Sequence, residues 1–373
     1  MILKLTPFSD STSTVILVLD GYQNSTKDLE HASRQKYSCA THAVDRDKKI
    51  PVSQKKFFSN STNKENLIGF LIHWLENSLI FQGVGFSLTM RKGQRDADTL
   101  VVKSAREECE KSAGPVAVHG TDTDLLMLML FHCHSYKNIF YNKINVSDVW
   151  ELMSDAERKV FLVAYCFTGV DTVSSIFGKG KASLLELFSS NGEIRDVIVP
   201  AFLDPNSSMD KIDELGVRLM RIIYGKTADV TLTKMRVDAY NKQCVSGKIK
   251  PERLPPTEDA ALFHGRRAFQ QCREWVLLDP DLTDTPFGWC WDGDMAMYLP
   301  VYTTRPVAPR ELESFVSCNC HGTCSKNICT CFQNRVKCLP SVCGHCSAEG
   351  NCQNLDDIEI EDPDEMELGD SDE

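Results

Sequence analysis

The chain has 373 residues, of which 42% are hydrophobic and 25% charged, a composition typical of globular proteins. No apolar run is long enough to span a bilayer, which argues against a membrane partner. The N-terminus lacks the pattern of a signal peptide, so we expect an intracellular protein.

The net charge of -11 arises entirely in residues 355–373. This stretch holds eleven acidic and no basic residues, and the rest of the chain holds 41 of each. We therefore expect a disordered acidic tail that is available to protein partners. The neutral body excludes a global electrostatic attraction for nucleic acid, so any DNA-binding surface must be a local patch.

The first predicted element is a buried parallel strand over residues 15–20, an apolar run that ends in Asp20 and Gly21. The polar segment that follows carries Lys27 and Arg34. It is interpreted either as a short basic helix near a phosphate backbone or as a solvated helix.

A polar stretch over 38–63 contains two short basic runs, at 46–49 and 55–56. These runs weakly resemble a nuclear-localisation signal, and for this reason we expect a nuclear protein. The alternative interpretation is that the stretch is an exposed loop. Apolar residues at helical spacing then predict an amphipathic helix over 64–81, followed by a short strand over 84–90.

Asp96 and Asp98 open a predicted helix that runs to about Lys111. The helix dipole favours anions in the first turn, which gives a structural reason for both carboxylates. The same position also places them at the mouth of the predicted sheet, where α/β folds bind ligands.

The most informative stretch, 116–125, is a β-prone run followed by Asp122 and Asp124. Carboxylates this close repel each other unless a cation neutralises them, and hard cations such as Mg²⁺ prefer oxygen ligands. The alternative is a solvated turn in which an Asp caps the helix formed by the apolar run Leu125–Phe131. The recurrence of carboxylates in similar settings favours a metal site. A short strand is predicted over 138–142.

A helix predicted over 154–167 leads to Asp171 and then to a glycine hairpin directly before another helix. The hairpin residues are Gly178, Lys179, Gly180 and Lys181. Backbone N–H groups and two lysines at a helix N-terminus suit a DNA phosphate, and a plain helix-capping loop is the alternative.

The pattern over residues 189–316 predicts a connector of helices and extended chain between the two domains. Helices are expected over 208–225 and 258–276, and the segment 287–300 is expected to pack as extended chain across a surface. Its tryptophans are interpreted as structural rather than base-stacking.

Taken in order over roughly residues 13–188, these elements resemble the flap endonuclease/XPG group of the PIN-like nuclease superfamily. The resemblance implies six catalytic carboxylates, at Asp20, Asp96, Asp98, Asp122, Asp124 and Asp171. It implies DNA contacts at Lys27, Arg34, Gly178, Lys179, Gly180 and Lys181.

The resemblance implies an α/β fold with a PIN-like (flap-endonuclease-like) parallel sheet and a helix-hairpin-helix. It also implies a structure-specific endonuclease or 5′-exonuclease that hydrolyses phosphodiesters with two Mg²⁺ or Mn²⁺ ions about 4 Å apart. The family's first strand, with its own Asp, has no counterpart here, and Asp96 and Asp98 occupy positions where Glu is usual. These departures leave a non-catalytic protein as the alternative.

The whole chain further resembles animal open reading frames, often multicopy and linked to mobile elements. These pair such a nuclease-like domain with a C-terminal cysteine domain. The similar segments are 167–172, 177–181, 254–257 and 288–289.

Nine of the 16 cysteines are clustered near the C-terminus. They are Cys318, Cys320, Cys324, Cys329, Cys331, Cys338, Cys343, Cys346 and Cys352. In an intracellular chain such a cluster indicates metal before disulfides. Each zinc ion binds four thiolates, so about three ions need roughly twelve ligand positions. Nine cysteines fill these positions if three of the thiolates each bridge two ions. So short a segment cannot bury an adequate core, so we expect metal to supply its folding energy.

The cysteine spacing resembles the tesmin/TSO1-type CXC domain, which binds three structural zinc ions and in several relatives reads DNA. The expected organisation is a PIN-like domain over 1–188, a connector over 189–316, a CXC zinc domain over 317–354 and the acidic tail. The first function hypothesis is a Mg²⁺-dependent nuclease that acts on DNA. The second is a non-catalytic nuclear zinc protein that binds nucleic acid or protein.

Overall fold

The computed structural model describes most of the chain up to residue 303 and separate positions beyond it. The described ranges are 13–21, 26–27, 39–47, 49–77, 86–93, 97–111, 113–225, 230–246, 250–279, 286–295, 297–303, 318–320 and 328–333, with the single residues 324, 338, 343, 352 and 354.

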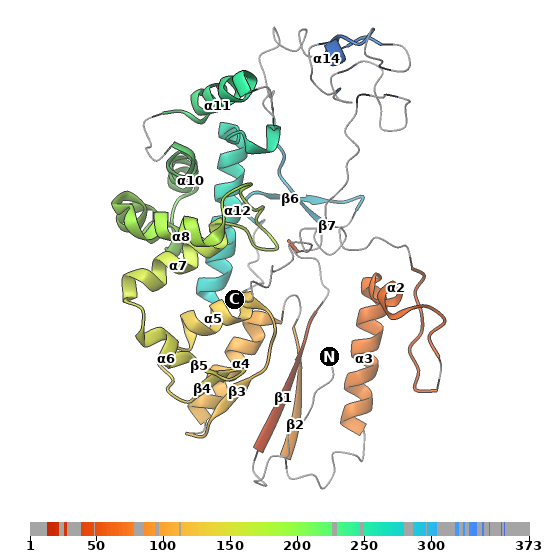
Figure 1. Cartoon of the computed structure of the whole chain (residues 1–373). Helices are drawn as coiled ribbons and strands as arrows, with labels where there is room; N and C mark the ends of the chain where they lie inside the picture. Colours follow the sequence, from red (N-terminus) through yellow and green to blue (C-terminus); the bar gives the residue numbers. More distant parts are fainter. Residues whose placement is uncertain are drawn as a thin grey trace, which may run out of the picture. The chain divides into compact units, whose positions relative to one another are not determined.

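The chain divides into two compact units, Met1–Thr303 and Thr304–Glu373. The first is a mixed α/β unit with small parallel sheets (Figure 1). The second contains a cluster of buried cysteines. At this level the expected α/β class with a cysteine-rich module is confirmed. Within the described ranges, no helix has the length and apolarity needed to cross a membrane.

A two-stranded parallel sheet is formed by β1 (Ser13–Leu19) and β2 (Phe86–Lys92). Both predicted strands and the parallel pairing of the first are thereby confirmed, to within two residues at each end. The burial predicted for the first strand is wrong: Thr14 is exposed and residues 15–19 are only half-buried. The N–H of Gly93 donates to the carbonyl oxygen of Leu19 at 2.9 Å, so the ladder continues to the point where both strands end. Because the strands are parallel, the loops that follow them leave from the same edge of the sheet.

A second sheet contains β3 (Val116–Val118), β4 (Ile139–Tyr141) and β5 (Ile144–Asn145). The β3–β4 pair is parallel and the β4–β5 pair is antiparallel. Asn142, in the turn between β4 and β5, has a φ of 53°, a left-handed conformation that Asn tolerates better than most residues. The predicted strands at 116–118 and 138–142 are confirmed.

A short helix, α2 (Gln54–Phe58), forms where the sequence favoured an exposed loop. The Ser53 hydroxyl accepts from the N–H of Lys56 and caps this helix, and Phe57 is buried against its surroundings. A local cap and one buried ring thus override the polar composition of the stretch. The next helix, α3 (Ser61–Asn77), begins three residues before the predicted start, and residues 78–81 lie outside the described residues.

The rest of the unit is mainly helical, and most of its helices surround one core. The helices are α4 (Asp98–Lys111), α5 (Thr123–His132), α6 (Val146–Glu151), α7 (Asp155–Phe167), α8 (Lys181–Ser190), the π-helix η2 (Ile194–Ile198), α9 (Val199–Leu203), α10 (Met209–Gly225), α11 (Leu232–Ser246), the 3₁₀-helix η3 (Pro251–Arg253) and α12 (Glu258–Leu277). The helices predicted near 96–111, 154–167, 208–225 and 258–276 are confirmed.

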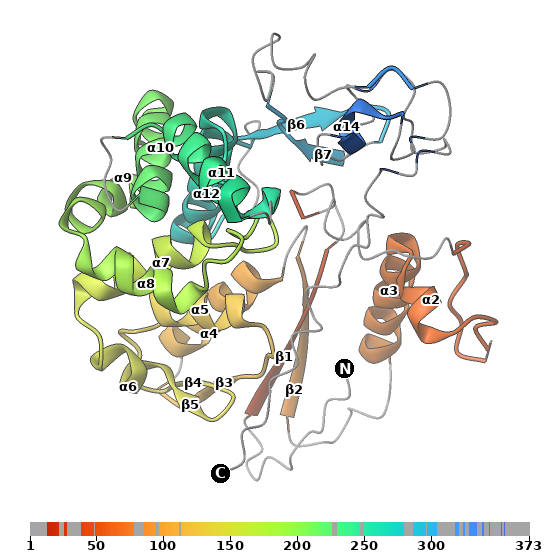
Figure 2. The same cartoon turned by 45° about the horizontal axis from the view of Figure 1, so that its top comes forward.

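The two long helices α10 and α12 pack side by side with a close backbone approach (Figure 2). A Cβ added to Gly216 would lie 3.0 Å from the Cα of Gly265, and the reverse distance is also 3.0 Å. Facing glycines let the two backbones meet, which brings the apolar faces of both helices into the core.

One buried cluster joins helices on both sides of residue 188. Ring centroids lie 6.3 Å apart for Phe167 and Phe188, 6.0 Å for Phe167 and Phe202, and 6.1 Å for Phe202 and Phe269. The helices of the expected connector therefore pack onto the same core as α7 and α8. The domain boundaries themselves stay a prediction.

The segment expected as extended chain is an antiparallel hairpin of β6 (Trp289–Asp292) and β7 (Met297–Pro300). Trp289 is buried, as expected of a structural tryptophan, whereas Trp291 is 46% exposed and contacts Tyr298 edge-on.

Candidate functional site

Two of the predicted carboxylates lie after the strands of the first sheet. Asp20 follows β1 directly and is exposed, and Asp98 is the first residue of α4 and half-buried. Asp96 and Arg34 lie outside the described residues. Because β1 and β2 are parallel and end together, Asp20 and Gly93 lie at the same edge of the sheet. That this edge binds a ligand stays a prediction.

Asp122 is the N-cap of α5: its Oδ1 accepts from the N–H of Asp124 at 2.9 Å. Asp122 therefore caps the helix, which is the alternative interpretation that the sequence offered for residues 116–125. Asp124 is different because it is buried, and the hydroxyl of Tyr165 donates to its Oδ1 at 2.8 Å. Capping does not explain a buried carboxylate in the first turn of an apolar helix.

The pKa of Asp124 is raised above its ordinary value, mainly by burial. The hydrogen bond from Tyr165 and the charge of Lys27 lower it, and the charges of Asp122 and Asp171 raise it. The structure thus brings three of the predicted carboxylates and one predicted lysine into one electrostatic neighbourhood. A bound cation would relieve the repulsion that raises this pKa.

Asp98 joins this neighbourhood through Tyr141. The hydroxyl of Tyr141 donates to the carbonyl oxygen of Asp122 at 2.8 Å. Burial raises the pKa of Tyr141, and the charges of Asp122 and Asp98 raise it further. The side chain of Tyr141 is 4% exposed, so these charges act at a largely desolvated site.

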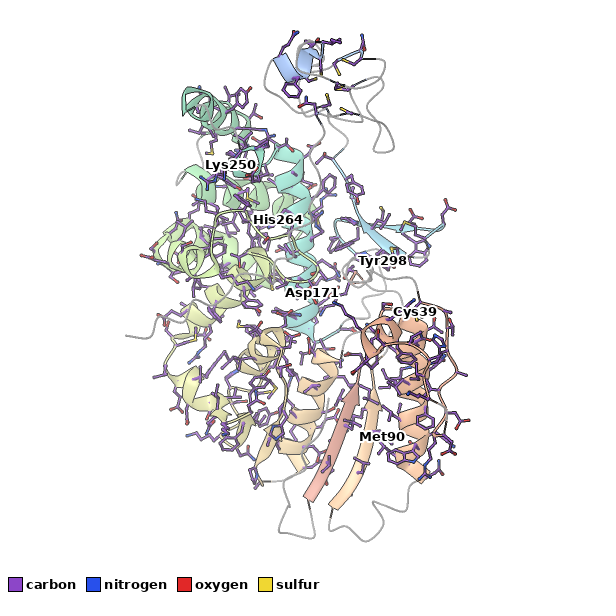
Figure 3. The ribbon with its side chains drawn as sticks, turned by 45° about the vertical axis from the view of Figure 1, so that its right-hand side comes forward. Cys39, Met90, Asp171, Lys250, His264 and Tyr298 are labelled. Carbon is purple, nitrogen blue, oxygen red and sulfur yellow. The ribbon has the colours of Figure 1, made fainter. Side chains whose placement is uncertain are left out.

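Asp171 lies in a tight turn after α7 (Figure 3). Val170 and Val173 exchange backbone hydrogen bonds of 3.0 and 2.9 Å across it. Gly169 has a φ of +124°, and a Cβ there would lie 2.9 Å from the Cα of Ser175, so this turn requires glycine. The Oδ2 of Asp171 lies 3.8 Å from the Nζ of Lys27.

The glycine hairpin leads directly into a helix, as predicted. Gly178 has a φ of +69°, and Gly180 is the N-cap of α8 without a side-chain cap. A Cβ added at either glycine would meet no atom within 4 Å, so the backbone here faces open space. Lys181 lies with its Nζ 3.8 Å from the ring centroid of Tyr165.

Tyr165 was not singled out by the sequence and proves central to this site. Its hydroxyl also lies 2.8 Å from the Oγ1 of Thr123. The only available signal was a tyrosine on the otherwise apolar inner face of a predicted helix, where a phenol needs a hydrogen-bond partner.

The donor chemistry of the site suits a hydrated divalent cation. Within the part of the chain that the structure describes, no three carboxylates place oxygens within 4.8 Å of one another. Mg²⁺ commonly keeps several waters and takes only one or two carboxylates directly, so separated carboxylates are compatible with it. The residues that would hold such an ion, directly or through water, are Asp98, Asp122, Asp124 and Asp171.

The C-terminal unit contains a second candidate site, built from cysteines around the short helix α14 (Thr330–Gln333). Three groups place their sulfurs within 4.8 Å of one another. They are Cys318, Cys329, Cys331 and Cys338; Cys318, Cys320, Cys324 and Cys329; and Cys324, Cys338 and Cys352. These cysteines are thus positioned to coordinate a metal ion, consistent with zinc.

The sulfur–sulfur distances match a metal site rather than disulfides. They are 3.8 Å for Cys318 and Cys324, 3.7 Å for Cys318 and Cys338, and 3.6 Å for Cys329 and Cys338. Thiolates about 2.3 Å from a tetrahedral zinc lie about 3.8 Å apart, whereas a disulfide is about 2 Å long. Cys331 and Cys343 lie 3.7 Å apart, and Cys346 lies outside the described residues.

Asn354 supports this site from outside the cysteine set. Its side-chain Nδ2 donates to the Sγ of Cys338 at 3.4 Å, and its carbonyl oxygen accepts from the N–H of Cys338 at 2.9 Å. Asn354 is 5% exposed. Nothing in the sequence pattern singled out Asn354, because asparagine is common in polar segments.

Comparisons with known proteins give no match: no family model, no curated protein and no solved structure matches this chain.

Proposed function

We propose that this chain is a divalent-metal-dependent nuclease-like protein that acts on DNA and carries a zinc-binding CXC module. The observation that supports it most is the environment of Asp124. This carboxylate is buried, and Asp122 and Asp171 raise its pKa further. Such an arrangement costs stability and is characteristic of a site built for a ligand rather than for the fold.

The proposal places the first unit in the PIN-like fold. The order of the elements supports this placement. A strand is followed by Asp20, and a helix then begins at Asp98. A second strand is followed by Asp122 and Asp124, and Asp171 lies in a turn. Parallel pairing of β1 with β2 and of β3 with β4 also supports it, although in the described residues the two pairs belong to separate sheets.

In this function a divalent ion, when bound, supplies an activated water and neutralises the charge on the leaving oxygen. The chain's own residues position it. Asp124 is held by Tyr165, and Asp122 is fixed by its cap on α5. Lys27, beside Asp171, and Lys181, at the start of α8, provide the positive charge that holds a DNA phosphate next to the carboxylates.

The zinc module is proposed to hold three structural ions. Cys318 and Cys329 belong to both four-sulfur groups, and Cys324 and Cys338 are each shared with the three-sulfur group. Shared sulfurs are what bridging thiolates require. Metal analysis of purified protein is expected to give three zinc ions per chain, and one ion per chain would reject bridging.

The nuclease proposal is tested by cleavage of labelled 5′-flap and single-stranded DNA in Mg²⁺ and in Mn²⁺. Asp122→Asn keeps a helix cap, because Asn caps as well as Asp, and Asp124→Asn keeps an acceptor for Tyr165. Each is expected to reduce cleavage by more than the roughly 100-fold that supporting residues of a metal site cost.

The matched control is Asp155→Asn, in the first turn of α7, whose side chain is 71% exposed. It is expected to leave cleavage unchanged. Absence of cleavage by the zinc-loaded, folded wild-type protein would reject the enzyme.

The second candidate is a non-catalytic nuclear zinc protein that binds nucleic acid or protein. The ion pair of Lys27 with Asp171 favours it, because a lysine then neutralises a carboxylate that an active site would offer to metal. Binding of the same DNA without cleavage, unaffected by Asp124→Asn, would support this candidate.

A further inference from the structure

The phenol of Tyr165 connects the carboxylate site to the glycine hairpin. On one side its hydroxyl lies 2.8 Å from Asp124 Oδ1 and 2.8 Å from Thr123 Oγ1. On the other side its ring lies 3.8 Å from the Nζ of Lys181. One half-buried side chain therefore contacts a proposed metal-holding residue and a proposed DNA-holding residue.

The direction of the hydrogen bonds follows from the chemistry. An ionised carboxylate only accepts, so the Tyr165 proton points to Asp124. The hydroxyl of Thr123 must then donate to the Tyr165 oxygen. Burial and the charge of Asp124 raise the pKa of Tyr165, so the phenol keeps this proton across the neutral range.

The ring of Tyr165 is held in place by its neighbours. Trp275 of α12 stacks on it with ring centroids 5.9 Å apart and planes 29° apart. Trp275 is itself buried, and its carbonyl oxygen lies 2.6 Å from the Nε2 of His132 on α5. The phenol is thus a fixed donor rather than a mobile one, which is what a group that orients a ligand residue requires.

We propose that Tyr165 is a positioning residue that fixes Asp124 for metal binding and keeps Lys181 beside it for the DNA phosphate. This inference rests on the proposed nuclease function and deepens it. The two roles belong to different parts of the side chain. The hydroxyl holds the metal-binding carboxylate of Asp124, and the ring holds the ammonium group of Lys181.

The test is Tyr165→Phe, which removes the hydroxyl and keeps the ring. Mn²⁺ binding to the zinc-loaded protein is measured by electron paramagnetic resonance, together with DNA affinity without added divalent ions. Tyr165→Phe is expected to weaken Mn²⁺ binding about tenfold, the usual effect of losing a supporting hydrogen bond at a metal ligand. Its DNA affinity should stay within about twofold of wild type, whereas Lys181→Gln should show the converse pattern.

The matched control is Tyr136→Phe. Tyr136 also donates to a carboxylate at 2.8 Å, but to Glu110 on the exposed side of α4. Unchanged Mn²⁺ binding in this variant shows that the effect belongs to Asp124 rather than to the loss of any tyrosine–carboxylate bond.

A metal-free measurement separates this inference from the function beneath it. The hydroxyl of Tyr165 donates to Asp124 Oδ1 at 2.8 Å, so Tyr165→Phe should shift the ¹³C resonance of the Asp124 carboxyl in the metal-free protein. If Asp124→Asn loses Mn²⁺ and Tyr165→Phe does not, the positioning role is overturned and the metal site stands. If wild type and Asp124→Asn bind Mn²⁺ equally, the nuclease proposal fails and Tyr165 positions no metal ligand. The carboxyl resonance then reports only whether Tyr165 still contacts Asp124.

Discussion

The Nε2 of His264 on α12 donates a hydrogen bond to the carbonyl oxygen of Phe167, the last residue of α7, at 2.8 Å. The same imidazole presents its Nδ1 3.4 Å from the hydroxyl of Ser174, in the turn after Asp171. A neutral histidine therefore joins α12 to the segment that carries the candidate site.

The burial of His264 predicts that the protein loses stability in mild acid. Burial lowers the pKa of His264 to about 4, the charge of Arg267 acts in the same direction, and the bond to Phe167 opposes both. The unfolded chain titrates near 6.5, so it binds the proton more readily between these values, and stability falls as the pH drops from about 6.5 to about 4. The full loss from this group is on the order of 3 kcal/mol.

The measurement is urea unfolding at about pH 7.5 and about pH 5, comparing wild type with His264→Gln. The variant should lose less stability between the two pH values. Burial also lowers the pKa of His132 to about 4, so part of the acid effect should remain in the variant. An identical pH dependence in both proteins would contradict the role of His264.

Asp124→Asn is predicted to increase the free energy of unfolding and to remove the proposed nuclease activity. The folded-state pKa of Asp124 lies above its unfolded value, mainly because of burial, so the wild type loses stability as the pH rises through that range. Asn removes this loss and still accepts from Tyr165. The expected gain at neutral pH is about 1 kcal/mol, typical of substitutions that relieve a functional site.

Thermal or urea unfolding at neutral pH and at about pH 3 checks this, because the gain should vanish where the wild-type carboxyl is protonated. A variant less stable than wild type at neutral pH would show that the ionised carboxylate serves the fold.

Gly265→Ala is predicted to destabilise the first unit even though alanine favours helices. A Cβ there would lie 3.0 Å from the Cα of Gly216, so the backbones of α10 and α12 would have to separate. Overpacking of this kind costs about 1–3 kcal/mol, more than the helix propensity that alanine adds, which is about 1 kcal/mol.

The matched control is Gly69→Ala in α3, where an added Cβ meets no atom within 4 Å. That change should stabilise the protein slightly, by up to about 1 kcal/mol. Urea unfolding of both variants gives the comparison, and equal effects of the two substitutions would refute the close approach.

Asn354→Ala is predicted to accelerate zinc loss from the C-terminal unit. The Nδ2 of Asn354 donates to the Sγ of Cys338, a sulfur shared by two of the candidate groups. Supporting hydrogen bonds of this kind typically change metal affinity by about 10–100-fold. Zinc transfer to a chromogenic chelator should be about tenfold faster or more in the variant, with the unfolding transition of the first unit unchanged. Equal transfer rates in the two proteins would exclude the role.

The sequence predicted elements whose pattern is local. The strand before Asp20 and the helix ending at Phe167 follow from apolar runs and periodicity. The hairpin at Gly178 and Gly180 follows from glycine spacing next to a helix.

The features that the sequence did not predict depend on contacts between residues far apart in the chain, which a local pattern cannot show. Tyr165 meets Asp124 across 41 residues of sequence, and His264 meets Phe167 across 97. The helix α11 (Leu232–Ser246) also escaped, because its polar sequence has little apolar periodicity. Long-range pairing decides these features, and a single sequence contains no record of it.

The shared core around Phe167, Phe188, Phe202 and Phe269 limits how this protein can be divided and recombined. A fragment that stops at residue 188 would lack Phe202 and Phe269 and would leave the ring of Phe167 without its contact to Phe202, so we do not expect residues 1–188 to fold by themselves. Among the described residues, the buried cysteines and the Asn354 that supports them all lie within 318–354, in the second compact unit. A segment whose metal ligands are this close in sequence can be moved between genes as one piece.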